Sequence, residues 1–151
     1  MIFREMAASD KCMVQAFFDN MSDRSASFFN VNHGNEKRTM EFFVNGKPDH
    51  RFFVITDDHE IIALAFIWDI NFSIPWIGIA VSDKYQGQGI GKMLLDELFS
   101  ILIRENYGGL ILRTSTENIP AQRLYVKCGF ENMGIHPSGE LLYIKRWHKN
   151  D

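Results

Sequence analysis

Apolar and polar residues follow one another in blocks that predict strands first and helices later. Residues 51–56 form a predicted strand, residues 57–60 a turn, and residues 61–70 a second strand, so close that the two strands are expected to pair as a hairpin. The run from Ile61 to Trp68 is apolar without interruption, which indicates a strand covered on both faces. A further strand is predicted over residues 74–81.

The second half of the chain alternates helices and strands. A long helix is predicted from about Gly89 to Glu105, because four apolar residues recur at helical spacing: Ile90, Leu94, Leu98 and Leu102. The remaining predicted elements are a strand over 110–114, a helix over 119–128, and closing strands over 130–135 and 141–146. This order predicts an α/β sandwich with at least one parallel crossover.

The first third of the chain has weaker patterns. Residues 1–6 alternate like a short strand, and Ser9 or Asp10 is a candidate cap for a helix that reaches about Asn20. Ser22-Asp23 offers a second helix cap. Residues 31–49 contain Asn, Gly and Pro without a clear period, so we expect a loop there.

Composition excludes several classes of protein. A length of 151 residues and an apolar content of 46% fit one domain over residues 1–151. The net charge is −3 and the basic residues are scattered, which argues against a nucleic-acid partner. Cys12 and Cys128 are far apart, as expected for reduced thiols in the cytoplasm. With Arg4 and Glu5 where a signal peptide would be apolar, and no long apolar run, we expect no membrane association.

A glycine-rich segment between a predicted strand and the long helix is the strongest candidate for ligand binding. It reads Gln86-Gly87-Gln88-Gly89-Ile90-Gly91. Glycines allow the backbone to approach a ligand closely, and the unpaired N–H groups at a helix N-terminus attract a diphosphate. Lys84 and Lys92 would add positive charge. A strand-to-helix turn that binds nothing is the alternative.

Two common nucleotide motifs do not fit this segment. The dinucleotide fingerprint that begins at Gly87 requires a third glycine at the position of Lys92. A P-loop requires glycine at position 86, which is Gln, and Ser or Thr at position 93, which is Met.

The segment does resemble the pyrophosphate motif of the GNAT superfamily of N-acetyltransferases, in which Arg or Gln is followed by two residues, Gly, one residue, and Gly or Ala. Gln86, Gly89 and Gly91 match these positions. The stretch from Asn118 to Phe130 resembles the family's later motif, Asn-x-x-Ala-x-x-Leu-Tyr-x-x-x-Gly-Phe. The resemblance covers about residues 61–130. It implies a three-layer α/β/α sandwich around a mixed, mostly antiparallel sheet of six to seven strands.

The resemblance also implies a function: transfer of an acetyl or other acyl group from acetyl-coenzyme A to a primary amine, by direct attack in a ternary complex, with no metal. The cofactor-binding residues that it implies are Ile79, Ala80, Val81, Gln86, Gly87, Gln88, Gly89, Ile90, Gly91, Lys92, Asn118, Ala121 and Tyr125. Tyr125 is the candidate catalytic residue, as a hydrogen-bond donor to the departing thiolate. A non-catalytic acyl-coenzyme A sensor on the same fold is the alternative.

The general base and the acceptor stay open at this stage. Candidate bases are Asp69, Glu117, His33, Glu36, Glu41 and His50, or a chain of ordered water. By resemblance, the acceptor pocket is formed by about residues 17–51 and 135–140. A small molecule or a peptide fits equally well as the amine, and a monomer or a homodimer as the assembly.

Overall fold

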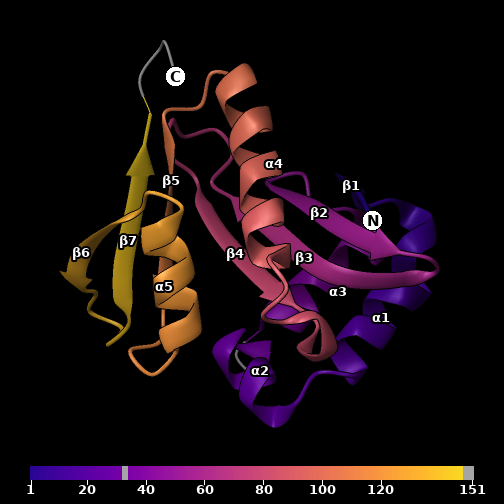
Figure 1. Cartoon of the computed structure of the whole chain (residues 1–151). Coiled ribbons are helices and arrows are strands. Elements are labelled where there is room, and N and C mark those ends of the chain that lie inside the picture. The colour runs from indigo at the N-terminus through magenta and orange to yellow at the C-terminus, as the bar shows by residue number, and fades with distance from the viewer. Residues whose placement is uncertain (32–33, 148–151) are drawn as a thin grey trace.

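The computed structural model describes residues 1–31 and 34–147, which form one mixed sheet with helices on both faces (Figure 1). The strands are β1 (Ile2–Glu5), β2 (His50–Asp57), β3 (Glu60–Trp68), β4 (Trp76–Val81), β5 (Gly109–Thr114), β6 (Glu131–Ile135) and β7 (Leu141–Arg146). The helices are α1 (Lys11–Asp19), α2 (Asp23–Phe28), α3 (Asn35–Asn45), α4 (Ile90–Arg104) and α5 (Ile119–Lys127), with short 3-10 turns at η1 (Ala8–Asp10) and η3 (Asp83–Tyr85).

The seven strands lie in the order β1-β2-β3-β4-β5-β7-β6, and every neighbouring pair is antiparallel except β4 and β5. The α4 crossover connects those two parallel strands. The predicted fold class, the hairpin formed by β2 and β3, and the parallel crossover are therefore confirmed.

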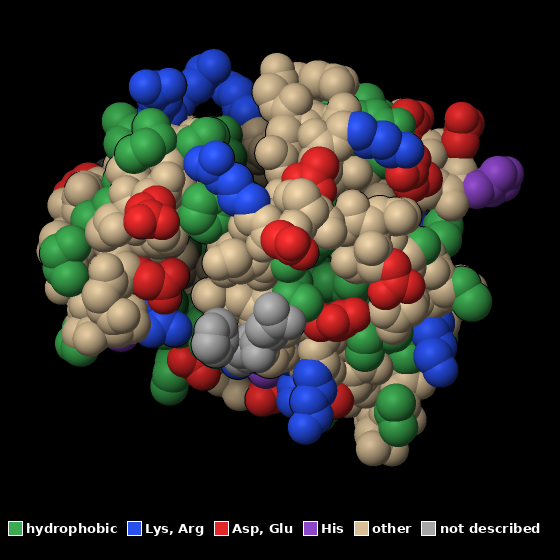
Figure 2. Space-filling model, turned by 90° about the horizontal axis from the view of Figure 1, so that it is seen from below, with side chains coloured by type: hydrophobic (Ala, Val, Ile, Leu, Met, Phe, Trp, Pro, Cys, Tyr) green, Lys and Arg blue, Asp and Glu red, His purple; other side chains and the backbone are tan. Residues whose placement is uncertain are grey.

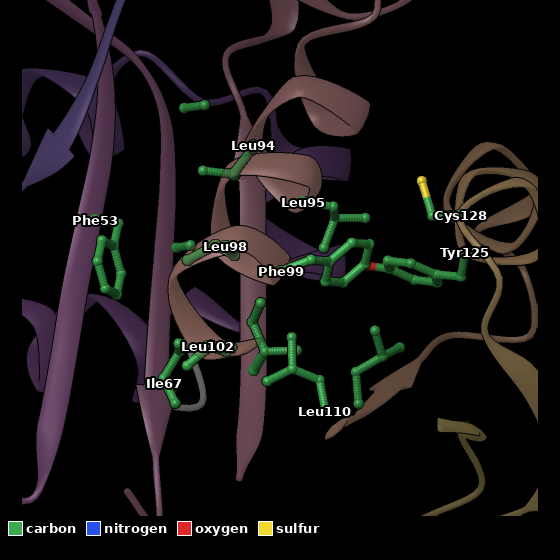
Figure 3. Packing of buried hydrophobic residues seen from close by; sticks show 14 of the residues in the cluster. Phe53, Ile67, Leu94, Leu95, Leu98, Phe99, Leu102, Leu110, Tyr125 and Cys128 are labelled. Carbon is green, nitrogen blue, oxygen red and sulfur yellow. The ribbon is translucent and has the colours of Figure 1, made fainter. Parts of the chain in front are cut away.

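Two apolar cores lie on opposite faces of the sheet. On one face, α4 packs Leu94, Leu95, Leu98 and Leu102 against the sheet, and the Tyr125 ring reaches in from α5 (Figure 3). On the other face, Val14, Phe17 and Phe18 of α1 pack against Leu64 and Phe66. Strand β3 supplies both cores, so residues 61–67 are at most 2% exposed. This confirms the prediction that the strand is covered on both faces.

One sequence-based expectation is wrong. Residues 35–45, which were expected to belong to a loop, form the helix α3. Gly34 begins it with φ at 111°, a conformation that glycine adopts without strain, and Thr39 within the helix is fully buried. Met40, Phe42 and Phe43 pack on the second core. Tertiary contact with the sheet stabilises this helix, because isolated helices of this length are only marginally stable in water.

Two strand ends also differ from expectation. The strand expected to reach residue 70 ends at Trp68, because Asp69 adopts a left-handed φ of 56° that starts the turn. The next strand begins at Trp76, immediately after Pro75. Among the helices of residues 1–31 and 34–147, none has the length and apolar character needed to cross a bilayer.

The parallel strands β4 and β5 are paired over a very short distance. The two strands form a single bridge, between Trp76 and Ile111, although β4 runs on to Val81 and β5 to Thr114. Their carboxyl-terminal halves therefore diverge. The sheet is continuous at one end and split at the other.

Candidate active-site cleft

A cavity of about 1100 Å³ lies in the split between β4 and β5 and is lined by residues from both faces of the sheet. Its walls come from β4, the glycine turn, the first turn of α4, the start of α5, and the helices α2 and α3. Figure 2 looks at this end of the molecule, where Lys and Arg side chains border a hollow between two lobes. Twelve of the thirteen residues expected to bind the cofactor line the cavity: Ile79, Ala80, Val81, Gln86, Gly87, Gly89, Ile90, Gly91, Lys92, Asn118, Ala121 and Tyr125.

The thirteenth, Gln88, lies outside the cavity lining of the described residues. Its side-chain amide Nε2 donates to the carbonyl of Lys84, 3.1 Å away, so Gln88 braces the turn from its outer side. Lys84 itself pairs with Glu60 at 2.8 Å. The expectations that Gln88 contacts the cofactor and that Lys84 adds charge at the site therefore gain no support from the geometry.

The glycine turn presents open backbone to the cavity. Gly87 and Gly89 have φ values of 76° and 82°, and a β-carbon placed on either would meet no atom within 4 Å. Gly89 is the N-cap of α4, and no side chain caps the helix there. The first N–H groups of α4, including those of Ile90 and Gly91, are therefore left for a ligand at the positive end of the helix dipole. This fits a diphosphate.

Two lysines supply positive charge at the end of the cavity near the glycine turn. Lys92 lines the cavity but also pairs with Asp96 at 2.6 Å, one helical turn further on. Lys127, at the end of α5, lines the cavity as well. Sequence analysis gave Lys127 no role, because a single lysine at a helix end is the usual complement of the helix dipole.

The exposed edge of β4 supplies backbone groups to the middle of the cleft. Ser82 N–H donates to Ile62 of β3 at 2.8 Å, and the Pro75 carbonyl accepts from Ile111 of β5 at 3.1 Å. Because strand residues alternate in direction, the N–H and C=O groups of Ile79 and Val81 point toward β5, where the bridge has already ended. The backbone of Ala80 faces β3, so only its side chain reaches the cavity.

Tyr125 lies between the core and the cleft. The residue is 6% exposed and lines the cavity from α5. Burial raises the pKa of the Tyr125 phenol well above its usual value of 10. The hydroxyl therefore stays protonated at neutral pH and can donate a hydrogen bond. Asn118 caps α5, since its Oδ1 accepts from the N–H of Ala121 at 3.3 Å.

The general-base candidates that were named from the sequence and that the structure describes do not line the cavity. Asp69, Glu117, Glu36, Glu41 and His50 are absent from its described lining, and His33 lies outside the described residues. Glu36 accepts from Gln15 at 3.0 Å, and Glu41 pairs with Lys47 at 2.6 Å. Both carboxylates are therefore engaged in contacts outside the cavity.

One carboxylate does line the cavity within the described ranges, in the segment 135–140 that was expected to help form the acceptor pocket, although it was not named as a candidate base. Glu140 immediately precedes β7, and its side chain is 24% exposed. Since Thr114 pairs with Leu141 across β5 and β7, Glu140 lies at the carboxyl end of β5, at the split end of the sheet. No motif marks this position; only the strand register brings it to the site.

Helix α2 is fastened to the loop that leads into the glycine turn. Asp83 accepts hydrogen bonds from the Ser22 N–H at 2.8 Å and from the Ser22 and Ser25 hydroxyls. Desolvation raises the pKa of the Asp83 carboxyl, but these hydrogen bonds outweigh it and hold the pKa below its usual value. Gln86 extends the contact, because its Nε2 donates to the Val81 carbonyl at 3.1 Å and to Ser25 at 3.3 Å.

Comparison with known proteins gives one consistent family. Residues 13–130 match the acetyltransferase (GNAT) family. The chain is 28% identical over 88 residues to a putative [ribosomal protein bS18]-alanine N-acetyltransferase of Bacillus subtilis, and the match spans 58% of each chain. The match therefore covers less than two thirds of that curated relative.

Two solved structures are similar over nearly the whole fold. The GNAT domain of S. lividans PAT has a TM-score of 0.83 at 14% identity, with 96% of this chain and 89% of that one covered. An N-acetyltransferase (paia) from Thermoplasma acidophilum, in complex with coenzyme A, has a TM-score of 0.78 at 15% identity, with 97% and 98% covered. At these identities the likeness concerns the fold.

Replacing Asp83 with Asn is expected to lower the free energy of unfolding at pH 7 by about 1.5–3 kcal/mol, because a charged acceptor is lost from the contact between α2 and the turn. The folded-state pKa is lowered, so the wild-type advantage is present above about pH 4 and disappears as the pH falls further. Urea unfolding between pH 3 and 7 measures it. Asp58→Asn, at an exposed turn, is the control. Equal stability of wild type and Asp83→Asn at pH 7 would contradict the role of this contact.

Proposed function

The chain belongs to the acetyltransferase (GNAT) family, and on this premise we propose that it is an N-acetyltransferase that uses acetyl-coenzyme A to acetylate a primary amine of a small molecule or peptide. The observation that carries the proposal is that one cleft combines an uncapped helix N-terminus, unpaired backbone of β4 and the buried phenol of Tyr125. Each of these suits a different part of an acyl-coenzyme A molecule.

The cofactor would lie along the cleft from the glycine turn to Tyr125. The N–H groups of the first turn of α4 would hold the pyrophosphate, with Lys92 and Lys127 adding positive charge. The edge of β4 at Ile79 and Val81 would pair with the amide groups of the pantetheine arm, as a neighbouring strand would. Asn118 and Ala121 would contact the arm from the start of α5.

Acetyl-coenzyme A supplies an acyl group activated as a thioester, which the neutral acceptor amine attacks directly. A fixed backbone N–H on the β4 edge would stabilise negative charge on the carbonyl oxygen, an effect of about 3–4 kcal/mol in other enzymes. The new nitrogen–carbon bond replaces the carbon–sulfur bond, and coenzyme A leaves with its sulfur hydrogen-bonded by Tyr125.

The burial of Tyr125 limits how its hydroxyl can assist the departure of coenzyme A. Full proton transfer from a phenol of pKa about 10 to a thiolate of pKa about 8.5 is already uphill by roughly 2 kcal/mol. The raised pKa in the protein makes it more so. Tyr125 therefore acts as a strong hydrogen-bond donor, or transfers its proton only in step with cleavage of the carbon–sulfur bond.

We assign the general base to Glu140. It is a carboxylate on the acceptor side of the cleft, on the same face of β5–β7 as Arg113, because both alternate with Leu112 and Tyr143 of the core. Its proposed role is to remove a proton from the incoming ammonium, directly or through one water molecule.

Binding of the cofactor is tested by thermal unfolding. Saturating acetyl-coenzyme A, at about a hundred times its dissociation constant, is expected to add roughly 2.7 kcal/mol and raise Tm by about 5–10 °C. Gly89→Asp should abolish most of this shift, because it places a carboxylate beside the pyrophosphate site. Gly134→Asp, also at positive φ but on the outer strand β6, should retain it. No shift with the wild type would contradict both an enzyme and a non-catalytic sensor.

Tyr125→Phe is expected to lower kcat by about 10–100-fold while the dissociation constant of acetyl-coenzyme A changes less than twofold, because only the hydrogen bond to the leaving sulfur is lost. Acceptor-dependent release of free thiol gives the rate. Tyr143→Phe is the matched control, since its ring lies 5.8 Å from that of Tyr125 but outside the described lining of this cavity. Unchanged turnover would remove Tyr125 from the mechanism.

Glu140→Gln is expected to lower kcat/KM at pH 7 by about 10²–10⁴-fold, as for loss of a general base. The loss should shrink as the pH rises, because the free amine then forms without help. A pH–rate profile of thiol release measures it, with Glu131→Gln on the exposed outer strand as the control. A pH-independent loss, or none, would exclude Glu140 as the base. A protein that binds acetyl-coenzyme A but never releases thiol with an amine would be the non-catalytic sensor.

A further inference from the structure

The cavity lining is unexpectedly basic. Its charged residues in the described ranges are Arg24, Arg38, Lys92, Arg113 and Lys127, against Glu140 alone. The carboxylates of residues 17–51, the segment expected to form much of the acceptor pocket, are absent from this lining: Asp19, Asp23, Glu36, Glu41 and Asp49. The positive charge of this lining would therefore repel an acceptor whose only charged group is an ammonium.

Besides the exposed Arg24, two arginines line the cavity, and Arg38 is the first of these two. It projects from α3 and is half-buried, with its Cζ 5.5 Å from the Phe66 ring centre and 5.2 Å from that of Trp68. Within residues 1–31 and 34–147 it makes no side-chain hydrogen bond and no ion pair. A cation–π contact does not use up the N–H donors of a guanidinium, so they remain available to an anion.

Arg113 is the second. It comes from β5, and its Cζ lies 5.6 Å from the ring centre of Trp76. Its polar contacts are weak: Nε is 4.0 Å from Glu140, and Nη1 is 3.4 Å from Nδ1 of His136. A guanidinium with contacts of this length retains most of its capacity for a carboxylate.

A single aromatic wall connects the two arginines. The Trp68 and Trp76 rings are stacked, with centres 5.9 Å apart and planes 11° apart, so Arg38 and Arg113 lie against consecutive rings of one row. This row lies on the α1–α3 face of the sheet, since Phe66 and Trp68 belong to the second core. The phosphate site at the N-terminus of α4 lies on the other face, so the cofactor leaves these arginines without an anion.

We propose that the acceptor is an amine that also carries a carboxylate, as a free amino acid does, and that Arg38 and Arg113 bind this carboxylate; the proposal rests on the acetyltransferase activity proposed above. Two arginines and Glu140 give this part of the cavity a formal charge of +1, and a zwitterionic amino acid, which adds no net charge, can place its carboxylate against the two arginines. The ammonium group is then matched by Glu140, beside which its proton must leave. A planar carboxylate also suits the paired N–H donors of a guanidinium.

The test compares acids with their amides in two assays. Thiol release from acetyl-coenzyme A is followed with glycine, L-alanine and L-phenylalanine, each against its amide. Separately, protein saturated with coenzyme A is titrated with the N-acetyl derivatives of the same acids and amides, with tryptophan fluorescence reporting binding near Trp68. The second assay needs no turnover, so it tests the acceptor site even in an inactive protein.

For at least one pair, we expect the acid to exceed its amide about tenfold or more in kcat/KM, and its acetyl derivative to bind about tenfold more tightly. Arg38→Gln and Arg113→Gln should each reduce this preference to threefold or less. Arg38→Lys and Arg113→Lys, which keep the charge but lose the fork of donors, should give intermediate values. Affinity for acetyl-coenzyme A should change less than twofold in all four variants, which also shows that they fold. Arg104→Gln, at the exposed end of α4, is the control.

The inference is overturned if no acid is preferred over its amide in either assay, or if the preference survives undiminished in both glutamine variants. Equal acetylation of acids and amides would leave the proposed acetyltransferase standing and refute the carboxylate site. Preferential binding of the acetylated acids without any turnover would do the opposite, because it supports the carboxylate site and refutes the enzyme.

Discussion

The early end of hydrogen bonding between β4 and β5 is the constraint on which the rest of the site depends. After the single bridge between Trp76 and Ile111, no strand pairs with the N–H and C=O of Ile79 or with the N–H of Val81, whereas the Val81 carbonyl accepts from the Gln86 side chain. Such groups cost about 1–3 kcal/mol each if they are buried without a partner. An open cleft keeps them available to water or to an extended ligand with amide groups of its own. The rest of the fold must therefore keep the carboxyl-terminal halves of β4 and β5 apart.

Packing on both sides of the gap keeps it from closing. Phe66 lies against Gly78, where a β-carbon would come within 2.7 Å of the ring, so the β4 side of the cleft is tightly filled by core. At the start of α4, Gly91 allows the first turn of this helix to contact Leu124 of α5, since a β-carbon at position 91 would lie only 2.8 Å from Leu124 Cδ2. Before the glycine turn, the hydrogen bond between Ser25 and Asp83 connects α2 to the loop that follows β4. The ligand site is thus surrounded by contacts that do not need the ligand.

Because the cleft lies between two apolar cores, its proposed cofactor side and its proposed acceptor side have different surroundings. The glycine turn and α5 face the core of α4, where an anionic cofactor would meet a helix dipole. The proposed acceptor side faces the aromatic core of α1–α3, where Arg38 and Arg113 lie over the rings of Trp68 and Trp76. Glu140 lies at the carboxyl end of β5, so proton removal and acyl transfer can occur where the two halves meet.

Local patterns in the sequence determined most of the fold and one half of the site. The β2–β3 hairpin, α4 and the glycine turn follow from residues close in sequence, since apolar period, helix caps and glycine conformations are local properties. The helix α3 could not be predicted in this way, because its stability comes from contact with the sheet. Glu140, Arg38 and Arg113 carry no motif; only strand register and helix packing bring them to one cavity. Local sequence patterns are therefore enough to predict how a cofactor would be bound. The residues proposed to contact the acceptor are brought together only by the fold, because a binding pocket assembled from distant elements leaves no periodic signal in any one of them.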